Sequence, residues 1–67
     1  MFMKILLGDI MYERNLTARQ VEIMTGVSKS TVSRIVNNQI IPRLDTLEEL
    51  AKGLNIKISD LYESDFQ

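Results

Sequence analysis

The sequence contains neither cysteine nor histidine among its 67 residues. Their absence excludes disulfides, thiolate nucleophiles, imidazole bases and the usual zinc ligands. We therefore expect no metal, no cofactor and no enzymatic activity. A chain without cysteine is compatible with a reducing compartment, and we expect a cytoplasmic location.

Long apolar segments are also missing, because no run of hydrophobic residues exceeds three. A membrane span needs about 18 or more, and the first seven residues lack the charge pattern and length of a signal peptide. We expect no membrane contact and one domain over residues 1–67, with a tail at 63–67 that frays. A chain this short buries only about 60% of its unfolded surface on folding, which favours self-association as a homodimer.

An excess of positive charge, common in proteins that bind nucleic acid, is absent, since the net charge is −1. The charge is unevenly distributed along the chain. Residues 1–43 carry six basic and three acidic side chains, whereas residues 44–67 carry two basic and six acidic ones. This distribution predicts a basic face and an acidic back, with weak attraction to nucleic acid that depends strongly on salt.

Apolar residues at helical spacing begin close to the N-terminus. They recur at steps of three and four from Met3 to about Arg14, which predicts an amphipathic helix. Gly8 weakens this helix by about 1 kcal/mol relative to alanine. The denser apolar run over residues 2–7 leaves a strand at the start as an alternative.

Two capped helices separated by a glycine turn are predicted over about residues 17–37. Thr17 is a plausible N-cap, and Gln20 completes a capping box. Gly26 stands where a helix ends in the left-handed conformation, because a residue without Cβ enters it freely. Ser28 then caps a helix that continues to about Asn37. This arrangement is a helix-turn-helix, and Asn38 is the residue expected at positive φ after it.

Two further helices are predicted after Pro42, which prevents helix at the residue before it. Asp45 or Thr46 caps the fourth, and Ser59 caps a short fifth that holds Leu61 and Tyr62. The expected fold is therefore all-α, a compact five-helix bundle. On α-helical spacing, Met24 and Thr25 face inward, and the expected core consists of Val21, Val27, Val32, Ile35, Leu47, Leu50 and Leu54.

The span from Leu16 to Tyr62 resembles the lambda-type repressor and Cro family of helix-turn-helix proteins. The segments that carry the resemblance are Leu16-Thr17, Thr25-Gly26-Val27-Ser28, Val32-Ser33-Arg34-Ile35, Pro42 and the run from Thr46 to Leu54. The resemblance implies a five-helix DNA-binding domain. It also implies a sequence-specific transcriptional regulator that binds double-stranded DNA, and we expect a repressor that acts as a dimer on an inverted-repeat operator.

Two positions depart from the family pattern. Glu22 replaces a small alanine that packs between the two helices of the motif. Its carboxylate either reaches solvent past its aliphatic stem or holds the helices apart. We favour the first, because a buried unpaired carboxylate costs several kcal/mol. Ala18 replaces a glutamine that contacts the DNA backbone or braces the second helix of the motif, so Thr17 or Arg19 would have to substitute for it.

The resemblance places the second helix of the motif in the major groove of DNA. Its base-contacting candidates are Lys29, Ser30 and Arg34, followed by Ser33 and Thr31. Its phosphate-contacting candidates are Thr17, Arg19, Asn37 and Arg43. Alternatives remain at this point. The base-contacting candidates could form an ordinary solvated helix face, the two other arginines could pair with neighbouring carboxylates, and the asparagine could simply terminate its helix.

Adjacent isoleucines at positions 40 and 41 stand out because two β-branched apolar residues in a loop are not easily buried together. One is expected to pack beside Pro42, and the other is available for a partner. The expected dimer contact consists of Ile40, Ile41, Leu61, Tyr62 and Phe66. It would place two recognition helices about 34 Å apart on one face of DNA.

The sequence offers weaker support for three other functions. The segment from Gly26 to Thr31 lacks the preceding glycines and the strand of a phosphate-binding loop. A Ser-Lys pair on an exposed helix lacks the burial that would lower a lysine pKa for catalysis. The strongest alternative is a protein-interaction module of antitoxin or anti-repressor type that keeps the fold without reading DNA. No small-molecule ligand is expected.

Overall fold

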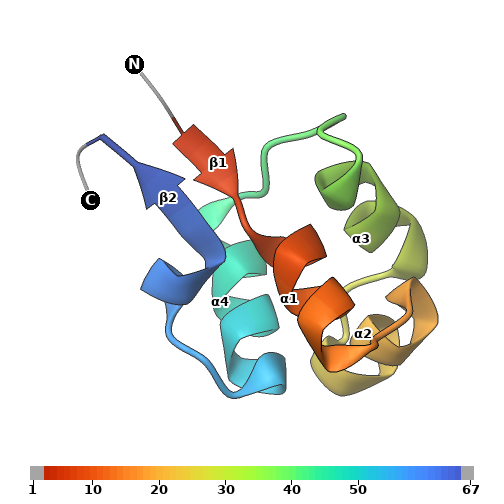
Figure 1. Ribbon diagram of the computed structural model, residues 1–67. Coiled ribbons are helices and arrows are strands. Elements are labelled where there is room, and N and C mark those ends of the chain that lie inside the picture. Colours follow the sequence, from red (N-terminus) through yellow and green to blue (C-terminus); the bar gives the residue numbers. More distant parts are fainter. Residues whose placement is uncertain (1–2, 66–67) are drawn as a thin grey trace.

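Four α-helices, one 3₁₀ helix and a two-stranded sheet make up residues 3–65, the part of the chain that the computed structural model describes (Figure 1). In chain order the elements are β1 (Met3–Ile5), α1 (Leu7–Arg14), α2 (Ala18–Thr25), α3 (Lys29–Val36), α4 (Leu44–Leu54), the 3₁₀ helix η1 (Ile58–Leu61) and β2 (Tyr62–Ser64). The prediction of an all-α five-helix bundle is therefore confirmed for the four α-helices. The short fifth helix is a 3₁₀ helix, and the all-α class is wrong because the described residues also form a two-stranded sheet.

Local hydrogen bonds fix the ends of α2 and the start of α3 as the sequence predicts. The Thr17 hydroxyl accepts from the Gln20 N–H at 3.1 Å, and the Gln20 side chain accepts from the Thr17 N–H at 2.8 Å. Gly26 ends α2 with φ 82°. The Ser28 hydroxyl accepts from the Thr31 N–H at 3.2 Å and so caps α3. These bonds satisfy amides that have no partner inside their own helix.

Asparagine residues in the left-handed conformation follow three helices. Asn15 ends α1 with φ 56°, Asn55 ends α4 with φ 58°, and Asn38 lies just beyond α3 with φ 60°. The prediction for Asn38 is confirmed. Asparagine is the non-glycine residue that enters this conformation most readily, because its short polar side chain bonds locally.

The start of α4 differs from the prediction. The helix begins at Leu44 with Arg43 in the N-cap position, and no side chain caps it. Asp45 and Thr46, the expected caps, lie inside the first turn instead, where the Asp45 carboxylate accepts from the Thr46 N–H at 2.9 Å. At the other end of α4, the Arg14 guanidinium donates to the Leu54 carbonyl at 2.8 Å and joins α1 to α4.

The hydrophobic core lies among all four α-helices and η1. All seven residues predicted for it are buried, and Leu7, Ala51 and Leu61 complete it. Met24 was expected inside but is 43% exposed, because α2 turns this side chain outward. Thr25 is half-buried, and its hydroxyl donates to the Val21 carbonyl at 2.7 Å. Its polar group is thus satisfied within α2.

The termini of the described chain pair in an antiparallel sheet. Met3 lies opposite Ser64, Lys4 opposite Glu63 and Ile5 opposite Tyr62. Residues 3–5 were expected to begin the first helix, so that prediction is wrong and the alternative of a strand is correct there. Residues 63 and 64, expected in a frayed tail, belong to β2 instead.

The short helix before β2 also differs from the prediction. Lys57, and not Ser59, precedes η1, and the Asp60 carboxylate accepts from the Lys57 N–H at 3.0 Å. Tyr62 lies in β2 and not in this helix. The chain extends there because it pairs with β1, a partner about 57 residues away in sequence.

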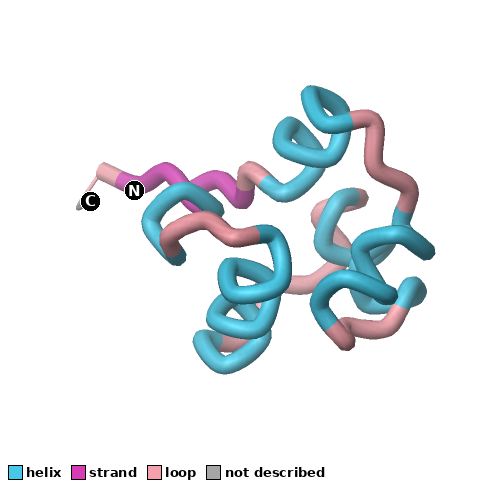
Figure 2. Tube along the Cα trace, turned by 90° about the horizontal axis from the view of Figure 1, so that it is seen from below, coloured by secondary structure: helices cyan, strands magenta, loops and turns pink. Residues whose placement is uncertain are grey.

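The sheet lies at one end of the molecule, and α2 and α3 lie at the other (Figures 1 and 2). The described residues span 32 × 23 × 23 Å. Within residues 3–65, no helix has the length and apolar character needed to cross a bilayer. The helix-turn-helix is therefore at the end of the molecule opposite the sheet, with one side of its second helix, α3, at the surface.

Candidate nucleic-acid interface

Helix α3 buries one side and exposes the other. Val32 is 0% and Ile35 is 2% exposed, and they anchor α3 in the core beside Val21 of α2. Side chains on the opposite side of a helix must then face solvent. That side carries the predicted base-contacting residues: Lys29, Ser30 and Arg34 are exposed, and Thr31 and Ser33 are half-buried.

The first turn of α3 is ordered by its own hydroxyl groups. The Ser28 hydroxyl donates to the Thr31 hydroxyl at 2.8 Å and lies 3.4 Å from the Ser30 hydroxyl. Thr31 is therefore engaged in capping the helix, which explains its partial burial. Ser30 and Lys29 project from an already ordered turn.

The charge on the exposed face of α3 is not neutralised by ion pairs. Within residues 3–65, the ion pairs join Lys4 to Asp9 at 3.7 Å and Arg43 to Asp45 at 3.4 Å, and all four side chains are largely exposed. Neither Lys29 nor Arg34 takes part in one. Their donors remain directed to solvent, where they are available to an anionic partner.

Glu22 reaches from α2 to the first amide of α3. Its Oε2 accepts from the Lys29 N–H at 3.2 Å, and the side chain is half-buried. This contact supports the interpretation that the carboxylate reaches the surface and does not lie unpaired between the helices. The bond also satisfies an amide that α3 itself leaves free.

The predicted phosphate-contacting residues flank α3 on two sides. Thr17 and Arg19 lie at the N-terminus of α2, and Asn37 and Arg43 lie in the segment between α3 and α4. All four are exposed. Arg43 pairs with the carboxylate of Asp45, as the alternative interpretation expected. Arg19 forms no ion pair in the described part of the chain.

Ala18 leaves space beside α3. It lines a surface hollow of about 210 Å³ together with Ser33 and Asn37 on the C-terminal half of that helix. A glutamine at position 18, as in the family pattern, would extend into this region. The shorter side chain keeps the start of α2 next to α3 but supplies no polar group of its own.

The predicted dimer contact is brought together only in part. Ile40 and Ile41 are 39% and 80% exposed, whereas Pro42 between them and α4 is buried. Leu61 is 0% exposed within the core, so its place in an interface is wrong. Tyr62 is half-buried in β2, and Phe66 lies outside the described residues.

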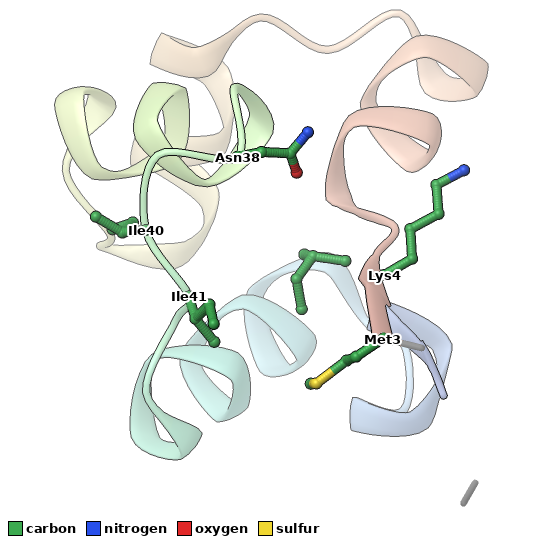
Figure 3. A pocket seen from close by; sticks show the side chains of 6 residues that line it. Met3, Lys4, Asn38, Ile40 and Ile41 are labelled. Carbon is green, nitrogen blue, oxygen red and sulfur yellow. The ribbon is translucent and has the colours of Figure 1, made fainter. Parts of the chain in front are cut away.

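The two isoleucines line one hollow together with residues of β1, which the sequence did not indicate. A hollow of about 430 Å³ is lined by Met3, Lys4, Ile5, Asn38, Ile40 and Ile41. Figure 3 shows Met3 and Ile41 facing this hollow from opposite sides, whereas Lys4 points away from it. Side chains alternate along a strand, so Met3 and Ile5 lie on the same side of β1. Their apolar character was the one feature of the sequence that could have indicated this hollow.

Catalytic or metal-binding clusters do not compete with this surface. Among residues 3–65, no group of three or more acidic, histidine or cysteine side chains is placed to hold a metal ion. No buried side-chain nitrogen or oxygen in this part of the chain lacks a hydrogen-bond partner.

Comparison with known proteins agrees with this geometry. The sequence pattern of a helix-turn-helix family matches residues 10–61. The fold is similar to that of a protein from Bacteroides fragilis, solved as a "putative DNA-binding protein", with a TM-score of 0.78 and 29% sequence identity. The similarity covers 92% of this chain and 100% of that one. No curated protein sequence gives a significant match.

Proposed function

Because this chain belongs to the lambda repressor/Cro-type helix-turn-helix family, we propose that it is a sequence-specific transcriptional regulator that reads double-stranded DNA with α3. The observation that carries the proposal is the outer face of α3. Its lysine and arginine have no ion-pair partner in the described residues, and its core side is anchored. A helix of this kind fits the major groove, which is wide enough to admit it.

Roles for individual side chains follow from their chemistry. Arg34 is suited to guanine O6 and N7, because its guanidinium donates two parallel hydrogen bonds. Lys29 contacts guanine or a nearby phosphate. Ser30, with Ser33 and Thr31 beside it, tolerates several bases and adds little discrimination.

Phosphate contacts set the position of the protein on the duplex and carry no sequence information themselves. We assign them to Thr17, Arg19, Asn37 and Arg43, which flank α3 on two sides. The amides at the N-terminus of α2 add a favourable dipole for a phosphate. The acidic side chains of the C-terminal third keep long-range attraction weak. Affinity should fall with salt because each phosphate contact releases counterions.

A homodimer on an inverted-repeat operator completes the proposal. One domain of this size reads few bases, and two copies related by a two-fold axis double the site. We assign the contact to the hollow between β1 and the segment after α3, with Ile40 and Ile41 from the original prediction and Met3 and Ile5 added. Repression by occlusion of the operator, in the cytoplasm, is the simplest action of such a domain.

Selection of duplexes from a random-sequence pool, followed by gel-shift titration, tests the proposal. We expect an enriched inverted repeat and a dissociation constant at least about 10³-fold lower than for random duplex at the same salt. Failure to bind any duplex at low salt and high micromolar protein would contradict it.

The alternative is a module of antitoxin or anti-repressor type that binds another protein through the same fold. The net charge of −1 and the 73% exposure of Ile23 on α2 favour it. Absence of DNA binding, together with a folded, helical protein that captures a protein partner through α2, would support this alternative over DNA reading.

A further inference from the structure

A single side chain links the two helices of the motif at the end that would enter DNA. The Glu22 Oε2 lies 3.2 Å from the Lys29 nitrogen, across seven residues of sequence. Lys29 is the first residue of α3, and its amide has no acceptor inside that helix. The Glu22 carbonyl also accepts from the Gly26 N–H at 2.8 Å. Both ends of the turn between α2 and α3 are thus held by one residue.

This bond constrains the direction in which α3 leaves the turn. The Ser28 hydroxyl holds the amide of Thr31, a local bond within the first turn. Glu22 instead lies on the preceding helix, so its bond to Lys29 relates the two helices to each other. The acceptor is a carboxylate, so the bond is charge-assisted, and its length of 3.2 Å lies at the upper end of the N–H···O range.

The carboxylate also places negative charge where a DNA backbone would approach. It bonds the amide of Lys29, the residue whose side chain we assign to the groove, so its charge acts on phosphates that approach this turn within a Debye length of about 8 to 10 Å. In the described part of the chain, no lysine ammonium or arginine guanidinium forms an ion pair with it. Its charge therefore opposes phosphate of any sequence equally.

We propose that Glu22 is a specificity-determining positioning residue. Its hydrogen bond to the Lys29 amide sets the angle of α3, and its charge lowers the affinity for DNA of any sequence. This inference rests on the proposed function, because it assigns a role at the same surface. Binding then depends on base contacts that only the correct angle allows.

Three substitutions separate the two effects. Glu22→Gln keeps an acceptor oxygen at the same reach and removes the charge. Glu22→Asp keeps the charge and shortens the reach by one methylene. Glu22→Ala removes both. Each is compared with the wild-type protein on random duplex and on the duplex that the wild-type protein selects from a random pool.

The proposal predicts opposite patterns for charge and reach. Glu22→Gln should bind random duplex about two- to fivefold more tightly at low salt and keep the wild-type ratio of selected to random affinity. Glu22→Asp should leave the random affinity unchanged and lower that ratio about fivefold or more. Glu22→Ala should bind random duplex more tightly, as Glu22→Gln does, and should also lower the ratio, as Glu22→Asp does. Ratios equal to wild type in Glu22→Asp and Glu22→Ala would overturn the positioning role.

Hydrogen exchange of the Lys29 amide gives a reading that does not require DNA. We expect protection in the wild-type protein and Glu22→Gln, and exchange at least about tenfold faster in Glu22→Ala. Equal exchange in all three proteins would overturn the inference even if DNA binding is found. Protection lost in Glu22→Ala, in a protein that selects no duplex, would support the bond and contradict the proposed function and the role in specificity.

Discussion

Gly53 of α4 lies directly against Thr25 of α2. A β-carbon built on Gly53 would stand 2.6 Å from both the Cα and the Cγ2 of Thr25, and it would also meet the Met24 carbonyl oxygen. Backbone atoms cannot yield as the tip of a side chain can. The absence of a side chain at position 53 therefore allows α4 to support the helix that carries Glu22.

The substitution Gly53→Ala should lower the free energy of unfolding by about 1 to 3 kcal/mol, because the overpacking exceeds the gain in helix propensity. Urea denaturation followed by circular dichroism measures it. Gly8→Ala is the matched control: its β-carbon would lie 3.3 Å from a side-chain methyl of Val36, which is 38% exposed, and would meet no backbone atom of another element. It should change stability by less than about 1 kcal/mol, and equal losses for both variants would contradict the explanation.

Arg14→Ala should destabilise the fold without affecting DNA binding. The Arg14 guanidinium donates to the Leu54 carbonyl at the C-terminus of α4, and we expect a loss of about 1 to 2 kcal/mol. Thermal unfolding measures the loss. Arg19→Ala serves as the control, since Arg19 is exposed and removed from the core. It should stay within about 0.5 kcal/mol of wild type.

Arg34→Ala and Arg43→Ala should differ in their effect on specificity. Loss of a base contact by Arg34→Ala should cost about 1 to 3 kcal/mol on the selected duplex and relax specificity at one base pair. Loss of a phosphate contact by Arg43→Ala should weaken selected and random duplex alike and reduce the salt slope by about 1. Equal losses on both duplexes for Arg34→Ala would refute its base-reading role.

Ile41→Lys should disrupt the proposed dimer and leave the monomer folded. Ile41 is 80% exposed on the hollow that β1 completes, so a lysine there should change the stability of the monomer little. In the dimer the same lysine would face the apolar surface of the second copy. Sedimentation with and without the selected duplex measures the mass. Leu44→Lys is the control, because Leu44 is 72% exposed but does not line this hollow. A monomeric wild-type protein on its operator would remove the dimer from the proposal.

Features that depend on neighbours in sequence could be predicted. The capping box from Thr17 to Gln20, the left-handed Gly26 and the Ser28 cap each involve residues within three positions of one another. Apolar spacing likewise identified Val32 and Ile35 as the buried side of α3. The candidate DNA-contacting face followed, because it is the opposite side of the same helix.

Features that depend on distant partners could not be predicted. Met3 fits a helical stripe as well as a strand, and only its pairing with Ser64 decides between them. Met24 is outside because of how α2 meets α4, which spacing alone does not specify. The Lys29 amide as the partner of Glu22 required the actual turn between α2 and α3.

The sheet between β1 and β2 has a further consequence for the order of folding. Its contacts join residues about 60 positions apart, so closing that loop carries the largest entropic cost in the described chain. The helix-turn-helix, built from short-range contacts, should be formed in the transition state before the sheet pairs. Substitutions in β1 should then accelerate unfolding in stopped-flow experiments and leave the folding rate almost unchanged.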